Sequence, residues 1–183
     1  MAAIPPHNLN GVLPPFAGTD VTSVAAHSPY RAPLSEVVDR FATSARRIEI
    51  LKGFFDLRRE LKLLGIVNGV QWLDGSFTEQ ISREPNDIDI ITIFEPPTAW
   101  SDPAIMAVAE SRTDLFDTRE SKKKYLCDAY YLDVQGLNMR ILIYWYGLFG
   151  HRRTTFEWKG LIEVDLAEDE QAAADLLAQK VIP

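Results

Sequence analysis

The pattern of hydrophobic positions divides the chain into alternating helices and strands. Apolar residues at spacings of three and four run through residues 44–64 and predict a long helix, with Ser44 as its N-cap and Gly65 just past its end. A shorter helix is expected at 34–41, with Ser35 as its N-cap. Apolar or alternating runs predict strands at 70–73, 87–94, 124–134 and 158–166. Further helices are expected at 78–82, 103–111, 137–150 and 167–181, and the third of these is apolar on nearly all sides and should be buried.

This order of elements predicts an α/β or α+β domain over residues 34–183, with a mixed sheet flanked by helices. Residues 1–33 hold six prolines and should form an extended, irregular arm, because proline fixes φ and removes a hydrogen-bond donor. The apolar content of the arm favours partial docking on the domain. Its candidate anchors are Ile4, Val12, Leu13, Phe16 and Tyr30.

Composition narrows the class of protein. The chain has 183 residues, of which 46% are hydrophobic and 25% charged, as expected for one soluble globular domain. Cys127 is the only cysteine, which rules out an internal disulfide and a cysteine-based metal site and suits the reducing cytoplasm. We expect neither a signal peptide nor a membrane span. The net charge of −7 disfavours non-specific coating of DNA, although a local basic patch stays possible.

The candidate chemistry lies in the stretch WLDGSFTEQISREPNDIDIITIF, residues 72–94. Asp87 and Asp89 are two apart on the expected strand and therefore point to the same side, where their charges repel and raise each other's pKa. An arginine, water or a divalent cation can offset this repulsion, and carboxylate oxygens suit Mg²⁺ or Mn²⁺. Upstream, Gly75 lets the backbone approach a phosphate closely, and Ser76 offers a hydroxyl and a cap for the next helix. The two halves together predict a site for a nucleoside triphosphate bound with metal.

The DGSF and NDIDI segments resemble the signature of the DNA polymerase beta-like nucleotidyltransferase superfamily. The spacing is similar in particular to the minimal nucleotidyltransferases of prokaryotic toxin–antitoxin and phage-defence systems. Phe77 departs from the pattern, since many members carry a basic or small residue there. The resemblance implies a nucleotidyltransferase-like fold and a third carboxylate on a later strand. Asp128 is preferred for it over Asp133, because Asp128 lies mid-strand, where an unliganded carboxylate is costly, and Asp133 lies near a turn.

The resemblance implies a metal-dependent enzyme that moves a nucleotide from an NTP to a hydroxyl. Asp87, Asp89 and Asp128 would hold Mg²⁺ or Mn²⁺, and Gly75, Ser76 and Lys124 would bind the nucleotide. The acceptor is open between a partner protein, such as a toxin or antitoxin, and an RNA. The net charge favours protein, and the basic clusters at 119–124 and 151–153 keep RNA open. Two alternatives remain: a non-catalytic binding module, such as an antitoxin or regulatory subunit, and a metal-free pair of aspartates neutralised by arginine.

Overall fold

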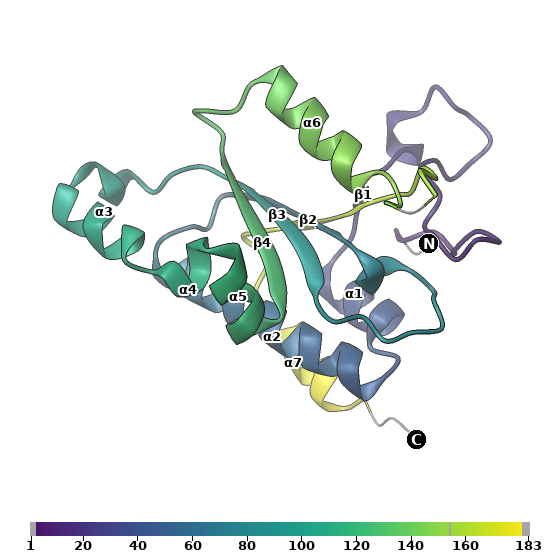
Figure 1. The fold of residues 1–183 in the computed structure, drawn as a ribbon, viewed down its shortest axis with the longest axis horizontal. Helices are drawn as coiled ribbons and strands as arrows, with labels where there is room; N and C mark the ends of the chain where they lie inside the picture. The colour runs from purple at the N-terminus through teal and green to yellow at the C-terminus, as the bar shows by residue number, and fades with distance from the viewer. Residues whose placement is uncertain (1–2, 154, 181–183) are drawn as a thin grey trace.

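A mixed five-stranded sheet forms the centre of the computed structural model, which describes residues 3–153 and 155–180 (Figure 1). The strands lie side by side in the order β1-β5-β2-β3-β4, with β1 parallel to β5, β3 parallel to β4, and β2 antiparallel to both of its neighbours. Helices lie on both faces, so the predicted fold class is confirmed. The strands are β1 (Tyr30–Arg31), β2 (Gly69–Asp74), β3 (Ile88–Phe94), β4 (Cys127–Asp133) and β5 (Ile162–Asp165).

The predicted bounds of a helix agree best with the structure for α2 (Ala45–Leu63), whose sequence has a capping residue at the start and a glycine after the end. The α-helices are α1 (Leu34–Phe41), α2 (Ala45–Leu63), α3 (Pro103–Glu110), α4 (Thr113–Phe116), α5 (Thr118–Tyr125), α6 (Met139–Phe149) and α7 (Gln171–Ala178). Short 3₁₀ turns occur at η1 (Val24–Ala26), η2 (Ser76–Thr78) and η3 (Thr98–Ser101). Ser44 caps α2 as predicted, because its side chain accepts a hydrogen bond from the backbone N–H of Arg47. Gly65 follows the end of α2 with a φ of +85°, a conformation that glycine adopts without steric cost.

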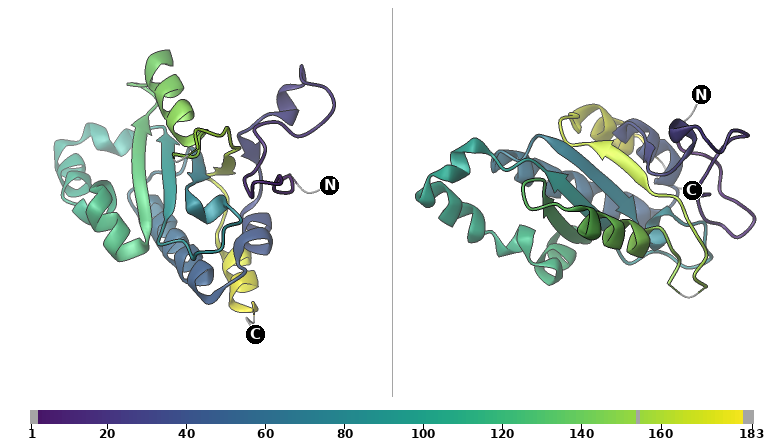
Figure 2. Two further views of the ribbon diagram at one scale, coloured as in Figure 1. Left: turned by 45° about the vertical axis from the view of Figure 1, so that its right-hand side comes forward. Right: turned by 90° about the horizontal axis from the view of Figure 1, so that it is seen from above.

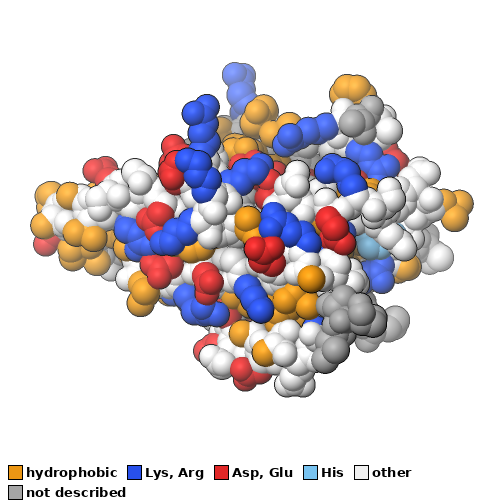
Figure 3. Space-filling view, turned by 60° about the horizontal axis from the view of Figure 1, so that its bottom comes forward, with side chains coloured by type: hydrophobic (Ala, Val, Ile, Leu, Met, Phe, Trp, Pro, Cys, Tyr) orange, Lys and Arg blue, Asp and Glu red, His pale blue; other side chains and the backbone are white. Residues whose placement is uncertain are grey.

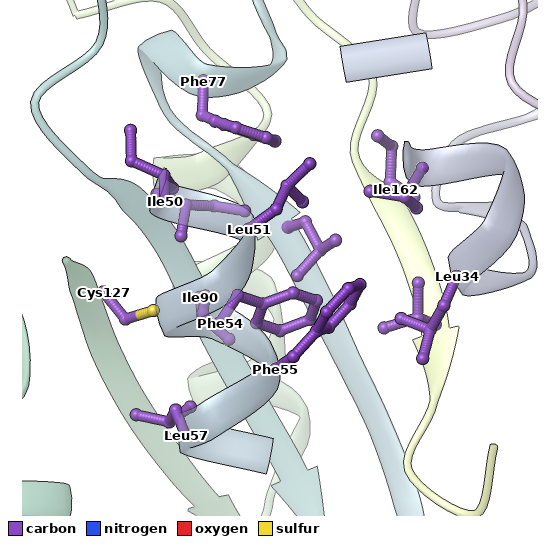
Figure 4. Packing of buried hydrophobic residues seen from close by; sticks show 14 of the residues in the cluster. Leu34, Ile50, Leu51, Phe54, Phe55, Leu57, Phe77, Ile90, Cys127 and Ile162 are labelled. Atoms are coloured by element: carbon purple, nitrogen blue, oxygen red, sulfur yellow. The ribbon is translucent and has the colours of Figure 1, made fainter. Parts of the chain in front are cut away.

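Helix α2 carries the main core against the sheet. Figure 4 shows Phe54 and Phe55 between the strands and α1, with Ile50, Leu51 and Leu57 along the same helix. All five side chains are almost completely buried. Full burial of such a side chain stabilises the fold by about 1.5–3 kcal/mol, so these five side chains supply a large part of the core on that face, which residues of α1, α5 and α7 complete.

Helix α6 lies on the opposite face of the sheet from α1, α2 and α7 (Figure 2). Its inner side packs on Trp72, Ile91, Tyr130 and neighbouring residues. The prediction that this helix is buried was wrong, because a single helix on an open face can bury only one of its sides. Its outer side exposes Met139, Ile143, Tyr144 and Leu148.

Three other local predictions were also wrong. Ser35 lies inside α1, and Pro33 is the residue at the N-cap, without a side-chain hydrogen bond. The short helix expected at 78–82 is instead the turn η2, Ser76–Thr78. The strand expected from residue 124 begins at Cys127, because the basic segment before it continues as helix α5 up to Tyr125.

The proline-rich arm lies along the domain. Ile4, Val12, Leu13 and Tyr30 are buried and Phe16 is half-buried, so hydrophobic contacts hold the described part of the arm. Its last residues form β1 and pair with β5. Among the described helices, none combines the length and the apolar character that crossing a membrane requires.

Candidate active site

Three aspartates lie in one row across neighbouring strands. Asp89 of β3 is in register with Asp74 of β2 on one side and with Asp128 of β4 on the other. Asp87 directly precedes β3, two residues before Asp89, and therefore points to the same side. That side is the α6 face, because side chains alternate along a strand and Tyr130, two residues beyond Asp128, packs in the α6 cluster. All four aspartates line one cleft with a volume of about 600 Å³.

Gly75 makes room for this row. Its φ is +83°, and a Cβ atom built on it would lie 1.9 Å from Oδ2 of Asp89. We predicted that a phosphate would lie close to the backbone at Gly75. The Asp89 carboxylate of the chain itself fills this space instead. Ser76 lines the same cleft, but η2 has only three residues and its N-cap position has no side-chain hydrogen bond. The expected helix N-terminus for an anion is absent at this described turn.

Asp89 is the least compensated of the four carboxylates. Burial, followed by the charges of Asp74, Asp87 and Asp128, raises its pKa to about 6, and Arg153 opposes this only weakly. Within residues 3–153 and 155–180, Asp89 has no ion-pair partner within 4 Å. Asp89 is therefore the residue at which a bound cation would relieve the most repulsion.

Asp74, Glu79, Arg152 and Lys159 form one network of ion pairs along a wall of the cleft, which we call the inner wall. Lys159, only 5% exposed, lies 2.9 Å from Oδ1 of Asp74 and 3.3 Å from Oε1 of Glu79. The contact to Asp74 is an ion pair rather than an aligned hydrogen bond, since among the described residues Oδ1 has no partner of good geometry. Burial raises the pKa of Asp74, and Lys159 opposes the shift. Arg152 closes the network at 3.1 Å from Glu79.

Lys122, rather than Lys124, reaches the cleft. The Lys122 ammonium contacts Asp87 directly and lies 3.4 Å from Oδ2 of Asp128, and these carboxylates raise its pKa. The structure does not bring the predicted nucleotide-binding residue Lys124 to the site, because its ammonium lies 2.8 Å from Asp114 outside the cleft.

Asp133 does not join the row. It is the last residue of β4, is exposed, and accepts a hydrogen bond at 2.7 Å from the backbone N–H of Gln135. It lines a separate pocket at the other end of the strand. Asp128, by contrast, lines the cleft with a side chain that is 19% exposed. The geometry therefore brings together Asp87, Asp89 and Asp128, as the sequence predicted.

A basic rim borders the acidic row. His151, Arg152 and Arg153 follow α6 and line the cleft, and Arg83 lines it from the loop before β3. Figure 3 shows another view of the surface, on which Lys and Arg side chains are interspersed with Asp and Glu. Although the net charge of the chain is −7, that face carries charges of both signs.

Sequence reasoning missed Asp74, Glu79 and Lys159. Asp74 directly precedes the Gly-Ser pair at the end of an apolar strand, where a carboxylate needs a partner, so a signal was present. Lys159 is a single lysine in a late apolar segment, and its partners are 80 or more residues away in the chain. Only the pairing of β2 with β5 brings it to the site.

The oxygens of Asp87, Asp89 and Asp128 are the ligand type that Mg²⁺ and Mn²⁺ prefer. As the side chains lie, the described ranges contain no group of three or more His, Cys, Asp or Glu side chains that is ready to hold a metal ion. The Lys122 ammonium lies between Asp87 and Asp128 instead. Metal binding at this site requires Lys122 to move, and its half-exposed side chain has room to do so.

Comparison with known proteins assigns the chain to a family without assigning an activity. No curated protein and no solved structure matched it. One family model matches residues 5–165, which include the docked arm, all five strands and the whole row of aspartates. The chain therefore belongs to that family, the family of unknown function DUF6932.

Proposed function

We propose that the protein is a metal-dependent nucleotidyltransferase, which moves a nucleoside monophosphate from an NTP to a hydroxyl of an acceptor. The observation that carries the proposal is the row of Asp89 and Asp128 on adjacent parallel strands, with Asp87 beside it and all three in one cleft. Aspartates in register on neighbouring strands repel one another, and a fold gains nothing from this repulsion unless a cation binds there.

Three features of the chain fit a divalent cation. The donors at the row are all carboxylate oxygens. The pKa of Asp89 is raised to about 6 mainly by burial and by the neighbouring negative charges, so a cation would be strongly attracted. Gly75 has no side chain, and this lets the Asp89 carboxylate lie at the centre of the row. We assign the metal ligands to Asp87, Asp89 and Asp128.

The remaining residues have separate roles in the proposed reaction. Arg83 and Arg153 lie exposed at the rim, where their positive charges can bind and orient a triphosphate. Lys159 and Arg152 keep Asp74 and Glu79 neutralised and hold the inner wall in place. The oxygen of the acceptor hydroxyl attacks the α-phosphorus, the bond to the β-phosphate oxygen breaks, pyrophosphate leaves and the hydroxyl proton passes to solvent. Bound metal would lower the pKa of that hydroxyl and offset charge on the leaving pyrophosphate.

Metal-dependent nucleotide binding is the direct test. Calorimetry with each NTP should detect a binding event with Mg²⁺ or Mn²⁺ that is absent in EDTA, because the uncompensated aspartates repel a triphosphate from the cleft. Asp89→Asn should abolish the metal-dependent part. Asp133→Asn is the matched control, since Asp133 lies on the same strand as Asp128 but outside the cleft. Equal affinity in EDTA and in Mg²⁺ would refute the proposal.

One contact favours a second candidate function. Lys122 already neutralises Asp87 and Asp128 in part, which suits a binding module in which the carboxylates hold no metal. In that case the cleft would bind a partner or nucleotide without turnover. A titration of the nucleotide-free protein with Mn²⁺ separates the two functions, because only the enzyme needs a metal site.

A further inference from the structure

A second cavity lies on the other side of the loop that walls the cleft. Its volume is about 370 Å³, and it shares Glu79, Ile81, Ser82 and Arg83 with the cleft. Gln80 and Glu84 of the same loop line it as well, and the other lining residues come from the arm, the end of α1 and the start of α2. Among these residues are two further arginines, Arg40 and Arg47.

The three arginines of this cavity lack the partners that arginines usually have. In the part of the chain that the structure describes, no carboxylate lies within 4 Å of Arg40, Arg47 or Arg83, whereas the chain carries an excess of acidic residues. Arg47 is only 8% exposed. Its guanidinium donates to the carbonyl oxygens of Phe77 and Glu79, which satisfies its hydrogen bonds, and the charge of Glu84 acts on it only from beyond 4 Å. A buried charge without a counter-ion is costly, so an anion would be favoured there.

Arg40 is held in position by His7 of the arm. One of its terminal nitrogens lies 3.0 Å from Nδ1 of His7, and its Nε is buried without a hydrogen-bond partner among the described residues. Because arginine can only donate, Nδ1 of His7 accepts, and Nε2 of His7 donates to the carbonyl of Thr78 at 2.9 Å. His7 is therefore neutral, which agrees with the lowering of its pKa by burial. The positive charge of the cavity comes from the arginines.

Two carboxylates also line the cavity, and their partners decide its net charge. The carboxylate of Glu79 is paired with Lys159 and Arg152 of the inner wall. Glu84 accepts a hydrogen bond at 2.8 Å from the hydroxyl of Ser44, the N-cap of α2. Glu84 alone therefore opposes three arginines, and the cavity keeps an excess of positive charge.

We propose that this cavity binds a phosphate group, either as free inorganic phosphate or as the terminal phosphate of a nucleotide. Planar guanidinium groups match phosphate oxygens in geometry, and three arginines line this one cavity. The site needs no metal, because its charge comes from arginine. It shares Arg83 with the cleft of the aspartate row, whereas Arg40 and Arg47 line this cavity and not the cleft.

The test is calorimetric titration with inorganic phosphate and, separately, with AMP, both in EDTA. We expect binding of at least one of the two in the millimolar range or tighter. Arg40→Gln and Arg83→Gln should each weaken it by about tenfold, because each removes a charge-assisted contact. Glu84→Gln should tighten binding by about threefold, since it removes the opposing charge and keeps an acceptor for Ser44. Arg59→Gln, on an exposed part of α2, is the control and should change nothing.

The two ligands identify the source of the phosphate. Equal affinities indicate a site for phosphate alone, and a tighter AMP complex indicates a nucleotide. Asp89→Asn should leave both affinities unchanged, which separates this cavity from the proposed metal site. Absence of binding to both ligands would overturn the proposal, and so would affinities that stay unchanged in Arg83→Gln, an exposed loop variant that keeps the fold.

Discussion

Replacing Lys122 with glutamine should make the nucleotide-free protein bind Mn²⁺ more tightly. In the structure the Lys122 ammonium contacts Asp87 and lies 3.4 Å from Asp128, so a metal ion must break both contacts before it can use these carboxylates. Lys122 is 48% exposed, and ion pairs of this kind contribute about 0.2–1 kcal/mol each. Together they give about 0.4–2 kcal/mol, which corresponds to roughly a two- to thirtyfold gain in metal affinity.

Calorimetric titration with Mn²⁺ in the absence of nucleotide measures this gain. Lys124→Gln is the matched control, because Lys124 lies on the same helix and pairs with Asp114 outside the cleft. We expect the control to bind Mn²⁺ like the parent. Unchanged or weaker Mn²⁺ binding by Lys122→Gln would refute the reasoning, since it would mean that the ammonium and the metal do not compete for the same carboxylates.

Three further predictions concern the aspartate row. Asp89 has a pKa of about 6 in the fold against a reference value of 3.8, so the metal-free protein should lose stability as the pH rises from about 4 to about 6. Asp89→Asn should therefore be more stable than the parent at pH 8 by about 1–3 kcal/mol, with the gap closing near pH 4; urea unfolding in EDTA at both pH values measures this, and a less stable variant at pH 8 contradicts it. Gly75→Ala should lower the melting temperature and abolish transfer, because its Cβ would clash with Asp89 and because a φ of +83° with a ψ of −167° is a conformation essentially restricted to glycine, which costs about 1–3 kcal/mol in an alanine; a fully active variant would show that the Asp89 position is not needed. Asp128→Ala should slow single-turnover transfer at least about a hundredfold, or 2.7 kcal/mol, whereas Asp133→Ala should stay within about fivefold; the reverse ranking would move the third ligand to Asp133.

The parts of the fold that could be predicted are those whose signals are local. Helix α2 has an apolar stripe, a capping serine and a terminal glycine, and all three agree with the structure. The sequence favours Asp128 over Asp133 as a mid-strand carboxylate, but Asp128 is the second residue of β4, and it lies in the cleft because the register of β4 places it beside Asp89. The register that aligns Asp74, Asp89 and Asp128 could not be predicted, since it depends on which strands become neighbours.

The choice of Lys124 failed because a helix was read as part of a strand. Asp117 and Glu120 form the D-x-x-E pattern of a helix start, and the Asp117 side chain does accept from the N–H groups of Arg119 and Glu120. On a helix, residues two apart point in nearly opposite directions, so Lys122 and Lys124 cannot share one site. Helix α6 failed for a different reason. Its sequence is apolar on nearly all sides, and periodicity then does not tell which side meets the sheet.

The distribution of counter-charges separates a structural half of the cleft from a reactive half. Asp74 and Glu79 are buried, and their partner Lys159 is only 5% exposed. A ligand that displaced one of these charges would leave another buried without a partner, so these ion pairs belong to the fold. Asp87 and Asp128 share a single half-exposed lysine, which solvent and ligands can reach. Asp89 lies between the two halves, and the described chain offers it no ion pair. A cation that enters the cleft therefore meets its largest unbalanced charge at Asp89 and its most easily displaced competitor at Lys122, and this is why variants of these two residues should change metal affinity in opposite directions.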